Sequence, residues 1–361
     1  MGKAWVIGFG GCVVLAGCGT VLAIQPDSSL ASDGGLPGSD GSSGDGAAFD
    51  ETGAPRDGSL APIDPPCAHS AATASCELAS GLSNLGGIAV GNGNVYFTRH
   101  ENPGGIYQVP TVGGDVAPFA IGSMFPAGLS ATTDSVFWVT EGDFQIVHQG
   151  FDAGMPSAST YGLALPAAQI VGVGLETFWT VPGSAAITNG QVRATALFNA
   201  GSPIALNEPL PTALAADADY VYFANKGGGG KVVRMSHSGS MRTEANLGFS
   251  DVTAIALSKV GIVAITSADG VFRASTMSDV TFASPWEKIS SNTLGVGAVA
   301  DDLTGTVYVL AANGALESIP NVPTPQLTTT SLASCPVGTA IAHDASHVYL
   351  ACKDTIVRVP K

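Results

Sequence analysis

The chain has 361 residues, of which 12% are charged, against about 25% in an ordinary globular protein. Its net charge of −15 and its pI near 4.5 would repel nucleic-acid phosphates, so we exclude DNA and RNA as partners. Short Ala- and Val-rich runs between Gly-rich turns favour many short, buried strands over long helices.

The first residues have the pattern of an export signal. After Lys3, the apolar run over residues 4–15 has about 12 residues, too short for a membrane-spanning helix, which needs about 20. The run ends in Leu15-Ala16-Gly17-Cys18, which resembles the lipobox of bacterial lipoproteins. The resemblance implies a signal peptide at residues 1–17, lipid on Cys18 and, with Gly19 next, a cell-envelope lipoprotein of the outer membrane, facing the periplasm or the exterior. An ordinary cleaved signal peptide with an incidental cysteine is the alternative.

A linker is expected at residues 18–66. This segment is rich in Gly, Ser, Asp and Pro and has few large apolar side chains, so it cannot offset the entropy lost on ordering. We expect a flexible tether that separates the membrane from a folded domain at residues 67–361.

Four cysteines remain in the expected domain, and an even number in an exported chain predicts disulfides. We favour Cys67–Cys76 and Cys335–Cys352, because each pair is close in the chain and would fasten one end of the domain. A pairing of an N-terminal with a C-terminal cysteine is the alternative, and no His/Cys spacing typical of zinc is present.

One pattern recurs along the domain about every 40 to 44 residues, the period of a four-stranded propeller blade. It consists of a small apolar run, a turn, a Val-aromatic run, a second turn and often an Ile/Val-x-Arg run. The Val-aromatic or equivalent runs of the successive copies begin at Val95, Val136, Thr177, Val221, Val263, Val307 and Val348. We therefore predict an all-β fold, a seven-bladed β-propeller, in preference to six or eight blades.

The aromatic runs indicate blades stacked face to face. Tyr96 and Phe97 are adjacent, so in a strand they point to opposite faces, and both faces must be buried. The seventh copy stops one strand short of a full blade at Lys361, while residues 77–81 supply an unmatched strand before the first copy. We expect this N-terminal strand to complete the last blade, with Leu78 beside Val357, so that no sheet edge stays open at the joint.

The Val95-Tyr96-Phe97-Thr98 and Ile/Val-x-Arg runs are similar to the YWTD and NHL-like propellers over about residues 77–361. The Asp of the YWTD motif is absent, because Arg99 follows Thr98. YWTD propellers usually have about six blades rather than seven, a further departure. No ligand of that family is therefore carried over to this chain.

In a propeller, the loops between the second and third strands of each blade surround one opening of the central channel. Here they carry polar side chains, which we expect to contact a small polar ligand, a peptide, a glycan or an envelope protein; solvated turn residues are the alternative. These candidates are Arg99, His100, Glu101, Glu141, Asp143, Asn225, Lys226, Asp269, Asn313 and Asp354.

Other polar features are interpreted as structural. We expect the arginines that recur in the third strands to pack between blades and pair with a carboxylate or carbonyl; these are Arg193, Arg234, Arg273 and Arg358. The Gly-rich run ending at Gly230 is followed by a strand, unlike a phosphate-binding loop. His343 and His347 flank a turn and have metal-ligand spacing only on a helix.

The sequence supports a surface-tethered, non-catalytic binding or scaffold propeller with an unknown ligand. The alternative is a metal-dependent hydrolase or lactonase with its site at the channel mouth, by analogy of fold alone. A third interpretation is a structural partner in an envelope assembly. No catalytic residue, cofactor or metal is predicted, and the membrane is reached only through lipid on Cys18.

Overall fold

The computed structural model describes Cys67 and residues 75–151, 159–162, 166–174, 176–183, 189–196, 201–226, 230–248, 251–258, 261–275, 282–283, 286–291, 295–301, 304–320 and 330–361. These residues form seven four-stranded antiparallel sheets, named here blades I to VII. Within a blade, the strands are called a, b, c and d from the axis outward. The predicted seven-bladed β-propeller is confirmed.

The first four blades follow the chain. Blade I has β2 (Leu85–Gly91), β3 (Asn94–Arg99), β4 (Gly104–Pro110) and β5 (Ala117–Ser123). Blade II has β6 (Pro126–Ala131), β7 (Ser135–Thr140), β8 (Gln145–Gly150) and β9 (Ser159–Gly162). Blade III has β10 (Ile170–Val173), β11 (Glu176–Val181), β12 (Gly190–Ala196) and β13 (Ser202–Glu208). Blade IV has β14 (Pro211–Ala216), β15 (Tyr220–Asn225), β16 (Lys231–Ser236) and β17 (Arg242–Asn246).

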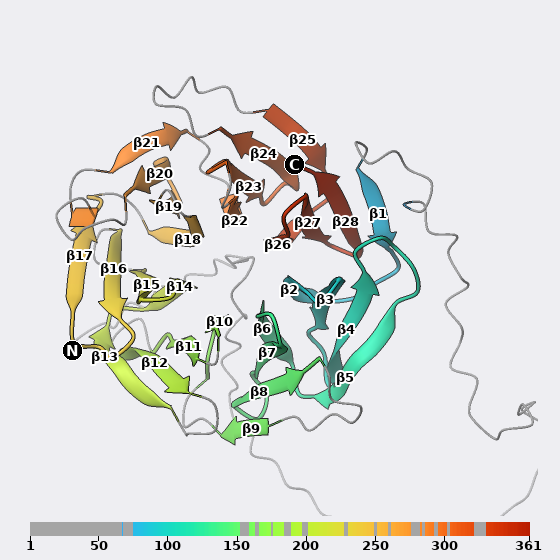
Figure 1. Cartoon of the computed structure of the whole chain (residues 1–361), viewed down its shortest axis with the longest axis horizontal. Coiled ribbons are helices and arrows are strands. Elements are labelled where there is room, and N and C mark those ends of the chain that lie inside the picture. Colours follow the sequence, from blue (N-terminus) through green and yellow to red (C-terminus); the bar gives the residue numbers. More distant parts are fainter. Residues whose placement is uncertain are drawn as a thin grey trace, which may run out of the picture.

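The last three blades complete the ring. Blade V has β18 (Val252–Ser258), β19 (Gly261–Thr266), β20 (Gly270–Ala274) and β21 (Glu287–Ser290). Blade VI has β22 (Gly295–Ala300), β23 (Val307–Ala311), β24 (Ala315–Ile319) and β25 (Thr330–Ser334). Blade VII has β26 (Gly338–His343), β27 (His347–Cys352), β28 (Thr355–Pro360) and β1 (Cys76–Ala79). The a strands surround the axis and the d strands form the outer wall (Figure 1).

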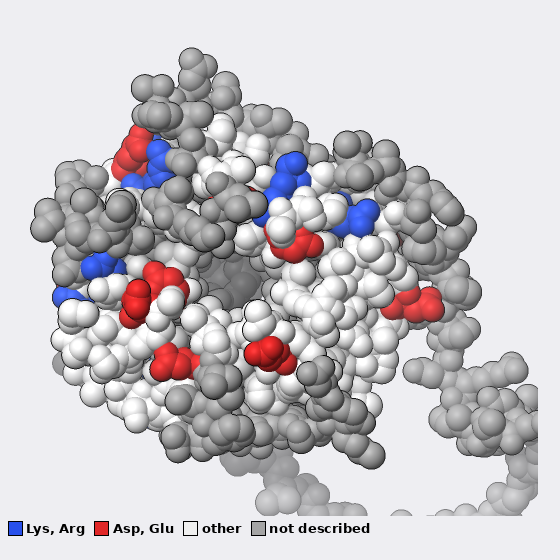
Figure 2. Space-filling model, viewed as in Figure 1, with Lys and Arg blue, Asp and Glu red and all other residues white. Residues whose placement is uncertain are grey.

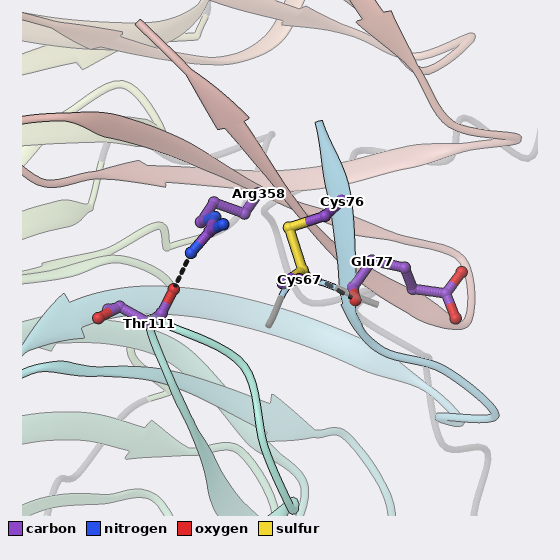
Figure 3. The surroundings of a disulfide bond; sticks show 5 residues. All are labelled: Cys67, Cys76, Glu77, Thr111 and Arg358. Carbon is purple, nitrogen blue, oxygen red and sulfur yellow. Dashed lines mark hydrogen bonds between the residues drawn. A yellow bond between two sulfur atoms is a disulfide. The ribbon is translucent and has the colours of Figure 1, made fainter. Parts of the chain in front are cut away.

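The two ends of the domain meet in blade VII, as expected. Strand β1 pairs antiparallel with β28, with Glu77 opposite Val357, and Leu78 is only 4% exposed. Arg358 donates from Nη1 to the carbonyl of Thr111 at 2.8 Å and so links blade VII to blade I (Figure 3). The ring is therefore closed by strands from opposite ends of the sequence.

Apolar side chains between neighbouring blades form the core. Tyr96 packs in a cluster with Val136 and Trp138 of blade II, whereas Phe97 packs in a cluster with Tyr349 of blade VII. Both aromatic side chains of β3 are buried. The prediction that each blade is covered on both faces is thus confirmed for blade I.

Two disulfides fasten the ends of the domain. Cys67 is bonded to Cys76 at the start of β1 (Figure 3). Cys335, just before β26, is bonded to Cys352 at the end of β27. Both favoured pairings are confirmed. The expected signal peptide, the lipid site at Cys18 and the linker lie outside the described residues. Within the described part of the chain, no helix is long and apolar enough to cross a bilayer.

Candidate binding site at the channel mouth

The alternation of strand direction places all b–c loops and all d–a connections at one end of the ring. A backbone hydrogen bond recurs there: the first residue after strand b donates its N–H to the carbonyl of the residue just before strand a. The donors are His100, Glu141, Lys226, Ser267 and Lys353, in blades I, II, IV, V and VII, at 2.8–3.1 Å. These equivalent positions define the mouth of the channel.

The channel is lined by the a strands and has a volume of about 950 Å³. None of the described residues that line it is Asp, Glu, Lys or Arg, and most are Gly, Ala, Val, Ile or Leu. Figure 2 shows the hollow at the middle of one face, with charged groups around it. The wall therefore matches the predicted small, apolar a strands, and charge is confined to the rim.

A set of hydroxyl groups in this wall was not predicted from the sequence. The a strands shift register against the b strands at the same point in blades I, II and IV to VII, as in a β-bulge. The residue at the bulge lines the channel, and in blades IV, V and VII it is Thr212, Thr253 and Thr339. A repeated Thr-Ala pair at the start of these strands is the sequence signal that could have located them.

These threonines differ in their partners. Thr253 donates to the carbonyl of Gly295 in the next blade at 3.2 Å, and Thr339 donates to that of Ala351 at 2.9 Å. The hydroxyl of Thr212 is buried and has no partner among the described residues.

Of the ten predicted contact residues, only His100 lines the channel. Its Nε2 lies 3.1 Å from Oε2 of Glu141 in the next blade, and its ring lies 5.5 Å from that of Phe125. Both His100 and Glu141 begin b–c loops, so the structure brings these two predicted residues together. The pair bridges blades I and II at the mouth.

The other candidates are not among the residues that line the channel. Arg99 pairs with Glu101 at 2.9 Å and donates to Ser83 at 2.8 Å. Asp143 is exposed and accepts a hydrogen bond from the hydroxyl of Thr140. Lys226, Asp269, Asn313 and Asp354 also lie in b–c loops, and Asn313 accepts from the backbone of Ala315 at 3.1 Å, as a turn residue does.

Asn225 is not an exposed group at the mouth. It is 0% exposed and donates from Nδ2 to Oε2 of Glu208 at 2.7 Å. The last residue of a b strand points between blades here, because Glu208 of β13 lies in the adjoining blade. The expectation that Asn225 could contact a ligand is therefore corrected: it is an interblade contact.

Asn225 belongs to a network that the sequence analysis missed. Glu208, only 3% exposed, pairs with Arg242, which also pairs with Glu244 at 2.6 Å, and Lys231 pairs with Glu244 at 2.6 Å. Burial alone would lower the pKa of Arg242, but Glu208 and Glu244 raise it. The hydrogen bond from Lys231 holds the pKa of Glu244 below its ordinary value.

The recurring arginines are structural, as expected. Arg193 donates to the carbonyl of Gly201 at 2.7 Å, and Arg273 pairs with Glu287 at 2.9 Å. Arg234 is buried and lies over the ring of Tyr220, with 4.3 Å from its Cζ to the ring centre. Of the Gly-rich run, Gly230 is described and the preceding three glycines lie outside the described residues.

His343 and His347 flank the a–b turn of blade VII, at the end of the ring opposite the mouth. Nδ1 of His343 lies 3.0 Å from Nζ of Lys361, whereas His347 contacts Ser346. Burial and the charge of Arg358 lower the pKa of His347. Among the described residues, no three His, Cys, Asp or Glu side chains gather as a metal site would require.

No protein-family profile matches this chain, and no curated protein matches it in sequence. Among solved structures, streptogramin B lyase matches with a TM-score of 0.64 at 14% identity, over 79% of this chain and 96% of that chain. U3-55K matches with a TM-score of 0.63 at 9% identity, over 80% of this chain and 98% of that chain. The computationally designed Ika8 protein matches with a TM-score of 0.55 at 12% identity, over 79% of this chain and 98% of that chain. At such identities the likeness shows the β-propeller fold alone.

Proposed function

We propose that this chain is a non-catalytic binding or scaffold propeller, held at the cell envelope by lipid on Cys18 and a flexible linker. Its ligand is a small polar molecule, a peptide, a glycan or an envelope protein, bound where the b–c loops converge. The observation that carries the proposal is the mouth itself: an apolar channel of about 950 Å³ ringed by polar loop residues in equivalent positions.

The chemistry of the mouth supports binding. Its charges have both signs: the His100–Glu141 pair bridges blades I and II, and Lys226 and Lys353 begin two other loops. Polar groups around an apolar concavity orient a ligand while its apolar part is buried. The lipid site and the signal peptide support the location on sequence grounds, through the resemblance of Leu15-Ala16-Gly17-Cys18 to a lipobox.

Photocrosslinking in the cells that make the protein tests this proposal. p-Benzoylphenylalanine replaces Lys226 or Lys353 at the mouth and, as a matched control, Asp219 in an exposed a–b turn at the opposite end. The expected result is one discrete adduct from both mouth positions and none from position 219. Equal adducts from all three positions, or adducts from position 219 alone, would place the ligand elsewhere.

The metal-dependent hydrolase or lactonase is the alternative, and streptogramin B lyase is an example of a propeller named for catalysis. A metal assay separates the two proposals. The purified full chain is analysed for bound Ca, Mg, Mn and Zn, and its melting temperature is compared with and without EDTA. A stoichiometric metal whose removal lowers the melting temperature would favour the enzyme.

A further inference from the structure

A second pocket lies between blades I and II, away from the central channel. It has a volume of about 450 Å³ and is bounded by the outer strand β5 on one side and by β7 and β8 on the other. The small residues Ala120, Gly122 and Ser123 of β5 leave space against the side chains of blade II. No residue that lines this pocket also lines the channel.

One buried amide in the pocket has an unfilled hydrogen-bond acceptor. Gln149 is 5% exposed; its Nε2 donates to the carbonyl of Phe119 at 3.3 Å, while its Oε1 has no partner among the described residues. Buried polar atoms in proteins nearly always have a partner, so an orphan acceptor in a pocket wall indicates a missing donor. A ligand hydroxyl or N–H would satisfy it.

The remaining polar groups provide both acceptors and donors. Asp143 and Gln145 flank the mouth side of the pocket, and Asp143 is held by the hydroxyl of Thr140. Ser123 accepts from Nε1 of Trp138 at 3.3 Å, so its own hydroxyl hydrogen is available. Asp143 is the single charged side chain among the described lining residues, which disfavours an anionic ligand.

An exposed aromatic side chain lies between two lining residues of this pocket in the sequence, in a costly backbone conformation. Phe144, between Asp143 and Gln145, has φ of 54° and is 40% exposed. Asp269 of blade V and Asn313 of blade VI correspond to Asp143. Each is followed by a glycine with positive φ, Gly270 and Gly314, at the position that Phe144 occupies in blade II. A left-handed conformation suits glycine and penalises phenylalanine, so glycine would be accepted at this position without strain.

We propose that the pocket between blades I and II binds a neutral sugar ring, separately from any ligand at the channel mouth. Sugar hydroxyls donate to Gln149 Oε1 and Asp143 and accept from Gln145, while the apolar face of the ring packs on Phe144. A pocket of about 450 Å³ suits one or two pyranose rings, since ligand sites for small molecules start at about 300 Å³. Because no residue that lines this pocket also lines the channel, either site can fail without the other.

Saturation-transfer NMR on the full chain tests the proposal. The probes are the methyl glycosides of glucose, galactose, mannose and N-acetylglucosamine, with triglycine amide as a peptide probe. We expect saturation transfer to at least one glycoside and none to the peptide. Transfer to no glycoside, or to triglycine amide instead, would overturn the assignment.

Variants then locate the site by titration with the glycoside that binds. Gln149→Met removes the side-chain amide, and Asp143→Asn replaces one carboxylate oxygen by an NH2 group, both at nearly constant volume. Each should raise Kd by about 10-fold. Asp269→Asn is the matched control and should leave Kd unchanged. Asp269 occupies the same position in the b–c loop of blade V, because it lies as many positions after Thr266 as Asp143 lies after Thr140. Unchanged affinity in both pocket variants, or weaker binding in Lys226→Ala, would place the sugar outside this pocket.

Phe144→Gly separates binding from folding. Glycine accepts the backbone conformation of this position, so the melting temperature should stay the same or rise while Kd rises at least 10-fold. Undiminished affinity in Phe144→Gly would show that the ring serves no ligand and would contradict the proposed stacking.

Discussion

Removal of the Glu208 carboxylate should be far more damaging than removal of an exposed one. Glu208 is 3% exposed, pairs with Arg242 and accepts from the fully buried Asn225, whereas Arg242 itself is 33% exposed. Glu208→Gln keeps one acceptor oxygen for Asn225 but loses the charge and the second acceptor oxygen that faces Arg242, so we expect a loss of about 1–2 kcal/mol in unfolding free energy. Glu208→Leu strands both partners and should cost about 3–5 kcal/mol, reduced where water reaches the guanidinium.

The matched control is Glu287→Gln, which removes the exposed partner of Arg273 in blade V. An exposed pair contributes about 0.2–1 kcal/mol at most. Urea unfolding of the full chain, followed by circular dichroism at low and at about 0.5 M salt, measures both effects. Salt should abolish the control's cost and leave most of the cost at Glu208, because burial limits screening. Equal costs for Glu208→Leu and Glu287→Gln would refute the interblade role of Glu208.

Three further outcomes follow from the same structure. Leu78→Ala in the closing strand should lower the free energy of unfolding by about 2–5 kcal/mol, measured by thermal unfolding. The control Leu206→Ala, at a side chain that is 55% exposed, should cost no more than about 0.5 kcal/mol, and similar losses in both variants would contradict the packing of β1. Replacing both Cys335 and Cys352 by serine should lower the free energy of unfolding in urea by about 3 kcal/mol, since the disulfide closes a loop of 17 residues. A reductant should then destabilise this variant less than it destabilises the parent chain. Burial lowers the pKa of His148 and of His347, so the unfolded chain binds protons at these residues more readily than the folded chain does. The free energy of unfolding should therefore be highest above about pH 6.5 and should fall as the pH drops through the lowered pKa values. His148→Gln should flatten the dependence of melting temperature on pH, and an unchanged slope would show that His148 does not contribute.

The ring could be predicted because its signals are repeated and local. Tyr96 and Phe97 point to opposite faces of one strand, which requires a neighbouring blade on each side. The last copy of the repeat has three strands, and the unmatched strand around Leu78 predicted the closure between β1 and β28. Each inference needed only strand geometry and the length of the repeat.

The site was harder to predict because it depends on where strands bulge and which face a strand end presents. Asn225 looks like a turn residue in the sequence, yet its side chain is buried against Glu208, a partner that only the packing of blades III and IV supplies. The bulge that turns Thr212, Thr253 and Thr339 toward the channel is set by pairing with the b strands. The left-handed conformation of Phe144 likewise has no signal in its own residue type.

The central claim is that strands from opposite ends of the chain share the last blade, which places the b–c loops around one mouth. Glu77 and Val357 are directly opposite in the register of β1 and β28. In a Cys67→Ser/Cys76→Ser background, Glu77→Cys with Val357→Cys should form a disulfide in air, detected by mass spectrometry of unreduced peptides. Glu77→Cys with Thr355→Cys, offset along the strand, should not. No disulfide from the first pair, or equal yields from both, would contradict the closed ring.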